Sequence, residues 1–406
     1  MAKKEKSLFI FKDLLSTIDT SMKGTSIMRE TEKSQKKREL ISTGIYVLNA
    51  AISGSLFGGI ARNRITAIGG ASSTGKSFLC YNICRQAQSE GYSIVYIDTE
   101  FSIELDQLPN YGIDVSEDKF TLIRSNVIED LKIFITRILD GLKAEKEAGK
   151  ELPKMLFVLD SVGQMASRKE TEDALSGKEK ADFTKAKALG SFFRIINSDL
   201  GYLNIGLICT NHTYLSMDMY PTEHMKGGSG LFYTASTIMF LSKAKLKEGI
   251  EDDLDLGQSG IVVTAKMVKN RLAKPKKVKF EISFVSGCNK YVGLDYWCTA
   301  ENFEQIGIAK GKIDESGKFI AGGNRWYVHH LGGHVKGSDL FSPNVFTDEV
   351  LKRMEPIIND YFKFKSVIEI DEINKKLEET KGKISEKELY GDDGLDSSNL
   401  FDEDED

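Results

Sequence analysis

The sequence predicts an α/β fold with a largely parallel sheet that helices cover on both faces. The order of apolar runs and helical patterns along the chain favours this class and shows where it changes. Short apolar, β-branched runs alternate with helical patterns from Ile41 to about Val285, as in strand–helix–strand units. The last runs follow one another without helices, which predicts an antiparallel extension of the sheet. Residues 290–390 form a smaller mixed α+β region.

The apolar runs give seven expected strands. They are Arg64–Ile68, Ser93–Asp98, Lys154–Asp160, Ile205–Thr210, Thr237–Leu241, Gly260–Met267 and Val278–Val285. Apolar residues at helical spacing predict helices over Lys76–Glu90, Ile128–Gly149, Lys180–Leu200 and Asp348–Lys363.

The N-terminal segment, residues 1–40, combines a predicted helix with a charged linker. Leu8, Phe11, Leu15 and Ile18 recur at helical spacing, which predicts an amphipathic helix over residues 7–19. A polar linker isolates this helix. It either folds back on the main domain or docks on a neighbouring subunit. The sequence thus predicts an N-terminal segment over 1–40, a core over 41–289, a small region over 290–390 and an acidic tail over 391–406.

Composition narrows the class of protein. The 406 residues are 41% hydrophobic and 28% charged, which excludes wholesale disorder. The formal charge is −5, but residues 392–406 contain eight acids and no base, so residues 1–391 carry +3. No apolar run approaches the roughly 18 residues of a membrane span, and Lys12 and Asp13 interrupt the apolar N-terminal stretch, which argues against a secretory signal.

The five cysteines show no CxxC spacing and are odd in number. Cys80 and Cys84 lie four residues apart in an apolar helical pattern, which favours core thiols over metal ligands. A reducing compartment, the cytoplasm, fits this pattern.

A phosphate-binding loop follows the first strand of the core. Its residues are Gly70, Ala71, Ser72, Ser73, Thr74, Gly75, Lys76 and Ser77, which match G-x-x-x-x-G-K-[ST] between a strand and an amphipathic helix. The glycines let backbone N–H groups approach a phosphate. Lys76 supplies a charge toward the β- and γ-phosphates, and the Ser77 hydroxyl can hold Mg²⁺. The sequence therefore predicts that this loop binds the phosphates of a nucleotide together with Mg²⁺.

Two carboxylates follow neighbouring strands. Asp160 ends an apolar strand and is the candidate second magnesium anchor; the alternative is a helix N-cap. Glu100 follows the strand that ends at Asp98 and is the candidate for orienting the attacking water; the alternative is a structural cap. Strand ends of a parallel sheet meet at one edge, where nucleotides bind.

The combined motifs resemble the RecA family of recombinases. They are STGIYVLNAAISG at 42–54, the phosphate loop, YIDTEFSIE at 96–104, LFVLDSVG at 156–163, ICTNH at 208–212 and MVKNR at 267–271. ASRKETEDAL at 166–175, TNHTY at 210–214 and the acidic tail resemble the UvsX-type recombinases of tailed phages. The resemblance implies a RecA-like core and a helical filament on single-stranded DNA that pairs and exchanges strands with homologous duplex DNA. It also implies head-to-tail self-assembly, a single-strand-binding protein and a loading mediator as partners, and a place in the cytoplasm of a host cell if a phage encodes the chain.

The resemblance also assigns roles to residues. Glu100 matches the catalytic glutamate, and His212 stands where bacterial relatives carry a glutamine that senses the γ-phosphate. Lys269 and Arg271 match two cations that reach the neighbouring subunit's ATP. Glu104 and Gln107 stand where relatives place an aspartate and a tyrosine around adenine, so base recognition is expected to be looser or built from other residues.

Two segments resemble DNA-binding loops. The first, residues 163–181, is polar and carries Arg168 and Lys169. The second, residues 213–230, is glycine-rich, and its apolar side chains are expected to be uncovered: Tyr214, Leu215, Met217, Met219, Tyr220 and Met225, followed by Lys226, Gly227 and Gly228. Such side chains can stack on or wedge between bases without reading sequence. The alternative is a lid that packs its methionines on its own domain.

Two other functions remain open at this point. A ring-forming helicase has the same core, and a non-catalytic DNA-binding protein would have a degenerate ATP site. The loop sequences argue against the helicase. The non-catalytic protein is disfavoured because the residues of the ATP site are intact, namely Lys76, Ser77, Glu100 and Asp160. The acidic tail either competes with duplex DNA for the basic surface or serves solubility.

Overall fold

The computed structural model describes residues 39–176, 184–217, 219–246 and 259–365. The predicted helix at 7–19 and the acidic tail lie outside these ranges. Contacts divide the chain into one unit up to Phe362 and a second from Lys363 onward.

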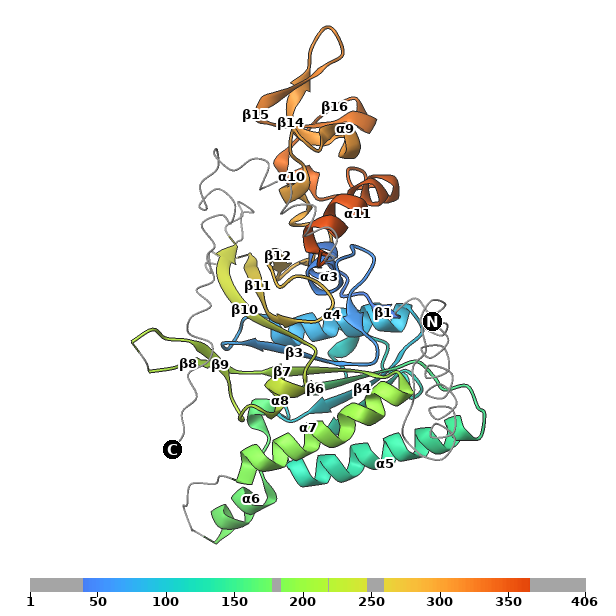
Figure 1. Cartoon of the computed structure of the whole chain (residues 1–406), viewed down its shortest axis with the longest axis vertical. Coiled ribbons are helices and arrows are strands. Elements are labelled where there is room, and N and C mark those ends of the chain that lie inside the picture. The colour runs from blue at the N-terminus through green and yellow to red at the C-terminus, as the bar shows by residue number, and fades with distance from the viewer. Residues whose placement is uncertain (1–38, 177–183, 218, 247–258, 366–406) are drawn as a thin grey trace, which may run out of the picture. The chain divides into compact units, whose positions relative to one another are not determined.

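A nine-stranded sheet organises this unit (Figure 1). Its order is β13 (Gly287–Cys288), β12 (Lys277–Ser283), β11 (Gly260–Asn270), β10 (Thr237–Leu246), β3 (Ile65–Gly70), β7 (Gly206–Asn211), β6 (Met155–Asp160), β4 (Ser93–Asp98) and β5 (Phe120–Arg124). The strands from β10 to β5 are parallel, and β11, β12 and β13 add antiparallel pairs. The predicted α/β class and its antiparallel extension are confirmed.

Helices cover both faces of the sheet (Figure 1). On one side lie α3 (Tyr46–Ser53) and α4 (Lys76–Ser89), and on the other α5 (Ile128–Glu147) and α7 (Thr184–Leu203). Successive residues of β4 alternate between the two cores: Ile94 and Tyr96 join the cluster under α3 and α4, while Val95 and Ile97 join the one under α5 and α7. Because both faces are buried, these strands appear in the sequence as continuous apolar runs.

The predicted strands and helices are confirmed in the described residues, with boundaries shifted by a few positions. The first residues of the predicted helix over 180–200 lie outside the described ranges. Strand β5 was not predicted, because it is a short edge strand in which only Phe120 is buried. Cys80 and Cys84 are fully buried on α4, and burial raises the pKa of both thiols, as expected of core residues.

The remaining elements are short. Strands β1 (Leu40–Ile41) and β2 (Ile60–Ala61) pair, as do β8 (Thr213–Leu215) and β9 (Glu223–Met225). Two further short α-helices of this part are α6 (Arg168–Leu175) and α8 (Gly230–Thr234). 3₁₀ helices cover Leu108–Tyr111 (η1), Val162–Gln164 (η2), Leu294–Trp297 (η3) and His329–Leu331 (η4).

The C-terminal elements of this unit contain a second, three-stranded sheet. Its strands are β14 (Ile308–Ile313), β15 (Phe319–Val328) and β16 (Gly333–Val335), and its helices are α9 (Phe303–Ile306), α10 (Gly337–Leu340) and α11 (Asp348–Phe362). Helix α11 is fastened to the loop after α3: Glu355 Oε2 accepts from the Leu56 N–H at 2.8 Å, and Asn359 Nδ2 donates to the Gly54 carbonyl at 3.1 Å. No helix among the described residues combines the length and apolar character needed to cross a membrane.

Candidate functional site

The phosphate loop joins the end of β3 to the start of α4. Its glycines are required by geometry. A Cβ on Gly70 would lie 2.7 Å from the Leu241 carbonyl oxygen, and Gly75 has a φ of 88°, in the left-handed region. Ala71, Ser72 and Ser73 are exposed, Thr74 Oγ1 donates to the Ala71 carbonyl at 2.9 Å, and Ser77 lies in the first turn of α4. The free N–H groups of this helix start form an anion site.

Lys76 holds its ammonium group over the loop. Its Nζ donates to the carbonyls of Gly70 at 2.9 Å and Ala71 at 2.8 Å, and the residue is 7% exposed. Burial lowers the pKa of Lys76, and the carboxylates of Asp160 and Glu100 act in the opposite direction. Two acids and one base predicted from separate motifs therefore share one site.

Asp160 ends β6, and a cis peptide bond joins it to Ser161. Its carboxylate is 7% exposed and is held from both sides. The Tyr96 hydroxyl on β4 donates to Oδ2 at 2.8 Å, and the Thr210 hydroxyl on β7 donates to Oδ1. Burial, and then Asp160, raises the pKa of Tyr96, so the phenol keeps its proton and donates.

Glu100 lies just past β4, beside the strand that carries Asp160. Its Oε1 accepts a hydrogen bond from Ser161 Oγ at 2.7 Å, and the same oxygen lies 3.6 Å from His212 Nε2. Thr99 supports the arrangement, because its hydroxyl donates to the Ser161 carbonyl at 2.7 Å and accepts from the Ser161 N–H at 2.8 Å. The structure thus brings Glu100, His212, Asp160 and Lys76 together.

Glu104 and Gln107 lie farther along the segment after β4. The Glu104 carboxylate is 62% exposed, 3.7 Å from Arg124 of β5, and Gln107 precedes η1. Helix η1 packs against α4 through Tyr111, whose ring centroid is 5.0 Å from that of Tyr81. The segment therefore lies against the helix that starts at the phosphate loop.

Lys269 and Arg271 are not brought to this loop. Strand β10 runs parallel to β3, and β11 runs antiparallel to both. Lys269, near the end of β11, pairs with Ile238 near the start of β10, whereas the phosphate loop follows the end of β3. The two cations and the loop therefore lie at opposite ends of the sheet. Lys269 Nζ donates to the carbonyls of Phe232 at 2.8 Å and Tyr233 at 3.0 Å. Burial, and then the charge of Arg271, lowers the pKa of Lys269.

Asn270, between the two cations, anchors the end of β11. Its Nδ2 donates to the carbonyls of Ala51 and Ile52 at 3.0 Å each, and its Oδ1 accepts from the Leu272 N–H at 3.1 Å. A register shift between β10 and β11 follows on the other side of Lys269, between the pairs Ile238–Lys269 and Met239–Met267. The backbone that carries both cations is therefore held against α3.

The first expected DNA loop, residues 163–181, contains helix α6 in the part that the structure describes. Ser167 and Glu170 form a capping box, which satisfies backbone N–H groups at the start of this helix. Arg168 pairs with Asp130 of α5, and its N–H donates to Glu129 at 2.8 Å, whereas Lys169 is exposed. Arg168 is thus already engaged by acids of its own chain.

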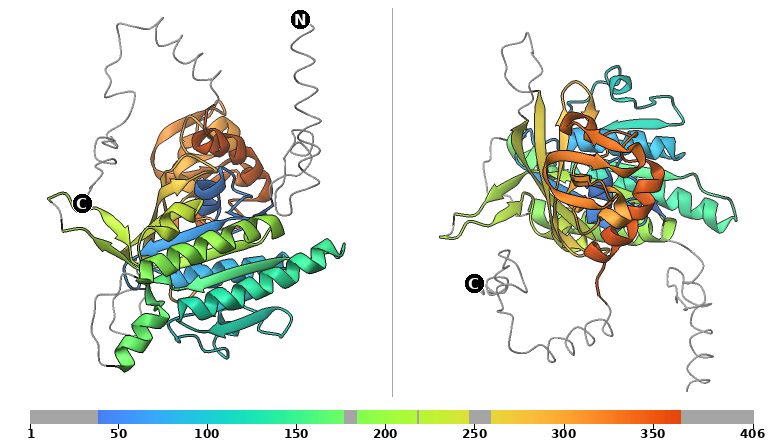
Figure 2. Two further views of the ribbon diagram at one scale, coloured as in Figure 1. Left: turned by 60° about the horizontal axis from the view of Figure 1, so that its bottom comes forward. Right: turned by 90° about the horizontal axis from the view of Figure 1, so that it is seen from above.

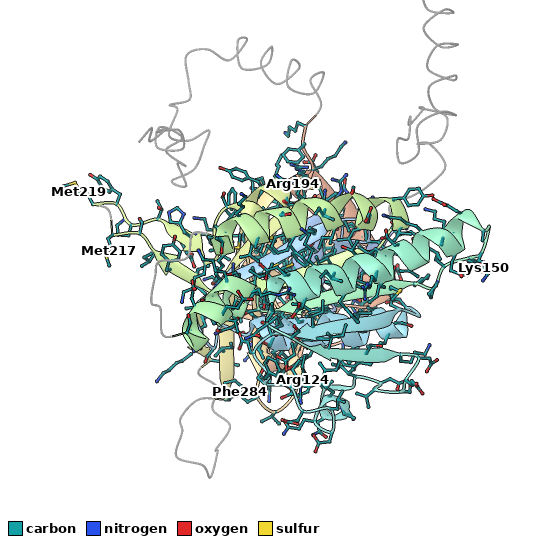
Figure 3. All side chains as sticks on the ribbon, turned by 90° about the horizontal axis from the view of Figure 1, so that it is seen from below. Arg124, Lys150, Arg194, Met217, Met219 and Phe284 are labelled. Carbon is teal, nitrogen blue, oxygen red and sulfur yellow. The ribbon has the colours of Figure 1, made fainter. Side chains whose placement is uncertain are left out.

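The second expected DNA loop is a hairpin of β8 and β9 that projects from the edge of the core (Figure 2). Five of its described side chains are uncovered, with exposed fractions of 50% for Tyr214, 65% for Leu215, 104% for Met217, 91% for Met219 and 77% for Tyr220. Figure 3 shows Met217 and Met219 at its outer end. Met225 is a correction: it is 8% exposed, because it faces the core under α5 and α7.

The base of the hairpin is tied to β7. The Lys226 N–H donates to the His212 carbonyl at 3.0 Å, and Asn211 Nδ2 donates to the Lys226 carbonyl at 2.7 Å. Gly227 and Gly228 have φ of 89° and 82°, and each would bring a Cβ within 3.0 Å of α7. These glycines thus allow a close approach of the chain to α7.

Sequence reasoning missed the residues that hold the site in place. They are Tyr96, Thr99, Ser161, Thr210, Asn211 and Asn270. Ser161 and Asn270 lie directly beside predicted site residues, so adjacency was an available signal. Tyr96 and Thr210 lie inside apolar strands and carry no local signal.

Comparison with known proteins identifies a family for this chain. A family model described as the RecA N-terminal domain matches residues 10–289. The chain is 29% identical over 377 residues to the recombination and repair protein of Enterobacteria phage T4, covering 91% of this chain and 92% of that protein. It is 27% identical over 328 residues to the RecA protein of Sulfurimonas denitrificans (79% and 85%) and 25% identical over 392 residues to that of Wolinella succinogenes (95% of each). The resemblance predicted from the motifs, including its phage-type features, is confirmed.

Proposed function

The chain belongs to the RecA family, and from this premise we propose that it is an ATP-dependent recombinase that assembles on single-stranded DNA and exchanges strands with homologous duplex DNA. The proposal covers recombination, repair and replication that depends on recombination. None of the observations above favours the alternative of a ring-forming helicase.

One contact supports the coupling of ATP hydrolysis to DNA. His212 Nε2 lies 3.6 Å from Glu100 Oε1, while its carbonyl accepts from the N–H of Lys226 at the hairpin base. One residue therefore touches both the expected catalytic carboxylate and the expected DNA-binding element. A shift of the hairpin on binding DNA would move His212 relative to Glu100.

The residues at the phosphate loop fit a nucleotide and a metal ion. Lys76 is buried, and among the described residues two of its three N–H groups have acceptors, which leaves one for a phosphate oxygen. Ser77 and Asp160 supply the oxygen ligands that Mg²⁺ prefers. Bound Mg²⁺ would neutralise charge on the phosphate oxygens. Glu100, held by Ser161, would orient the attacking water and accept its proton.

Lys269 and Arg271 would act on a neighbouring copy. Both lie at the opposite ends of the strands from the phosphate loop of their own chain. A head-to-tail contact would place them at the neighbour's phosphates, where positive charge would stabilise the transferring phosphoryl group. Such a contact does not close on itself and generates a helical filament. Lys269 would leave the carbonyls of Phe232 and Tyr233 to take this role.

The projecting hairpin is the proposed contact with DNA bases. Its exposed aromatic and flexible apolar side chains can stack on bases of any sequence. Lys169 would contribute a phosphate contact, and Arg168 would do so after leaving Asp130. A single-strand-binding protein and a loading mediator are the further partners that we propose.

A strand-exchange assay tests the function as a whole. With ATP and Mg²⁺, the protein should convert a homologous duplex and a circular single strand into joint molecules, and a heterologous duplex should give none. Electron microscopy of the same mixture should show helical filaments. Closed rings that unwind duplexes without pairing would support the helicase instead.

Replacing Glu100 by glutamine should separate binding from hydrolysis. The amide keeps the size of the side chain but cannot accept the water's proton, so turnover should fall by about 10²–10⁴-fold while ATP still binds. Steady-state hydrolysis and nucleotide binding would be measured side by side. Glu117→Gln, an exposed control, should behave like the parent. Parent-like turnover in Glu100→Gln would remove Glu100 from the mechanism.

Replacing Leu215 and Met217 by serine should weaken binding to single-stranded DNA. The loss of two apolar contacts with the bases should raise the dissociation constant by about tenfold, an effect near the lower end of that for an aromatic stacking contact, which is roughly 1–3 kcal/mol per base. Fluorescence anisotropy with a labelled oligonucleotide would measure it. Leu331→Ser, at an exposed leucine of η4 outside the hairpin, is the control. Unchanged affinity in the double variant would favour the lid alternative.

A further inference from the structure

Asp160 is gripped by one hydroxyl from each neighbouring strand. Strands β4 and β7 flank β6 on its two sides. The Tyr96 hydroxyl donates to Oδ2 at 2.8 Å, and the Thr210 hydroxyl donates to Oδ1. Each oxygen of the carboxylate therefore has its own donor, and each donor belongs to a different strand.

The strand register explains how the two hydroxyls reach the carboxylate. Thr210 follows Cys209, which pairs with Leu159, so it lies directly beside Asp160. Tyr96 pairs with Val158, one same-face position before Asp160. Its long side chain therefore extends along the sheet under α4 toward the strand ends. The ring packs against those of Tyr81 and Phe120, with centroids 5.9 and 6.1 Å away.

Burial makes these hydroxyls informative. Tyr96 and Thr210 are both 0% exposed. A buried hydroxyl is unfavourable unless it is hydrogen-bonded, and phenylalanine or valine would fill the same space without that requirement. Bonds to an ionised carboxylate are about twice as strong as neutral ones. The placement of both hydroxyls thus serves Asp160 rather than core packing alone.

We propose that Tyr96 and Thr210 are positioning residues that orient the Asp160 carboxylate for a strictly octahedral cation, and so set the preference of the site for Mg²⁺. The proposal rests on the proposed role of Asp160 as the metal-site acid. Each carboxylate oxygen has two lone pairs, and the hydroxyls occupy one on each. The remaining lone pairs are thereby held in fixed directions. Mg²⁺ demands near-ideal geometry, whereas Mn²⁺ takes the same oxygen ligands with more tolerance.

The test compares Tyr96→Phe and Thr210→Val with the parent in the full-length protein. Each substitution removes the donor and leaves the shape nearly unchanged. Tyr81→Phe is the matched control, because it removes a neighbouring phenol that forms no hydrogen bond with Asp160. The direct readout is electron paramagnetic resonance of bound Mn²⁺ with a non-hydrolysable ATP analogue, competed by Mg²⁺. The second readout is the Mg²⁺ concentration for half-maximal ATP hydrolysis.

Partners of metal ligands typically change metal affinity by about 10–100-fold when removed. In Tyr96→Phe, the Mg²⁺ needed to displace Mn²⁺ and to support hydrolysis should therefore rise by about tenfold, with activity in Mn²⁺ less affected. Thr210→Val should shift in the same direction, and Tyr81→Phe should match the parent. Unchanged Mg²⁺ midpoints in both variants, with lower melting temperatures alone, would show a merely structural role and overturn the proposal.

Asp160→Asn separates this proposal from the function on which it rests. If Asp160→Asn weakens Mg²⁺ binding while Tyr96→Phe and Thr210→Val do not, the positioning role fails and the metal site stands. If Asp160→Asn itself leaves Mg²⁺ binding unchanged, the metal role of Asp160 fails, and the positioning proposal with it. Should Tyr96→Phe fail to fold, Thr210→Val decides alone, because it acts from the opposite strand.

Discussion

The Lys76→Ala variant should hydrolyse ATP about 10³-fold more slowly than the parent, since it loses the one side-chain charge placed within the phosphate loop. The ammonium is 7% exposed and held by the loop carbonyls of Gly70 and Ala71. Buried among these groups, its charge is poorly screened and acts strongly on a phosphate. A steady-state assay with saturating single-stranded DNA would measure the loss.

The control for Lys76 is a lysine outside the site. Lys132 of α5 donates to Ser191 at 3.1 Å, and Lys132→Ala should keep parent-like turnover. Melting temperatures of both variants would show that the fold is kept. Near-normal hydrolysis in Lys76→Ala would contradict the assignment of the loop as the ATP site.

Replacing Lys269 and Arg271 together by alanine should spare ATP binding and cut DNA-stimulated hydrolysis by about 10³-fold or more, the range for cations supplied to a phosphoryl transfer from a neighbouring subunit. Neither cation lies near the phosphate loop of its own chain, so binding by an isolated chain should be unaffected. Turnover and nucleotide affinity would be measured on the same preparation. Unchanged turnover at saturating DNA would refute the role.

The matched control removes the same charge elsewhere. Lys277 and Lys279 are exposed on β12, and replacing both by alanine should leave turnover at saturating DNA close to that of the parent. A similar loss in this control would show that net charge, rather than the two cations at the end of β11, governs hydrolysis.

Mixing the two inactive proteins tests whether the cations act in trans. Lys76→Ala chains keep Lys269 and Arg271, and the double variant keeps its phosphate loop. In a random head-to-tail filament about a quarter of the sites combine an intact loop with an intact neighbour, so activity should reappear on mixing. If no activity returns although mixed filaments form, the cations serve their own chain and the filament model fails.

Local patterns predicted the parts of the site that depend on sequence spacing. The phosphate loop, Asp160 and Glu100 each follow a strand, and parallel strands end at one edge of a sheet, so their meeting was foreseeable. The ion pair of Arg168 was not predictable in the same way. Its charge suggested DNA, yet folding places it beside Asp130 of α5, which is 38 residues away in sequence. Met225 likewise was expected to be uncovered, but the base of the hairpin turns it into the core.

The sequence by itself determined the order of strands and helices, the phosphate loop and the family, because strand runs, helical periodicity and glycine placement are written in neighbouring residues. Only the tertiary structure decided which side chains and carbonyls contact the candidate catalytic and metal-binding residues. Whether Tyr96 packs as a core aromatic or grips Asp160, and whether Lys269 faces its own loop or the far end of the sheet, depends on strand order and register. Those are set by burial summed over the whole core, which no short stretch of chain contains.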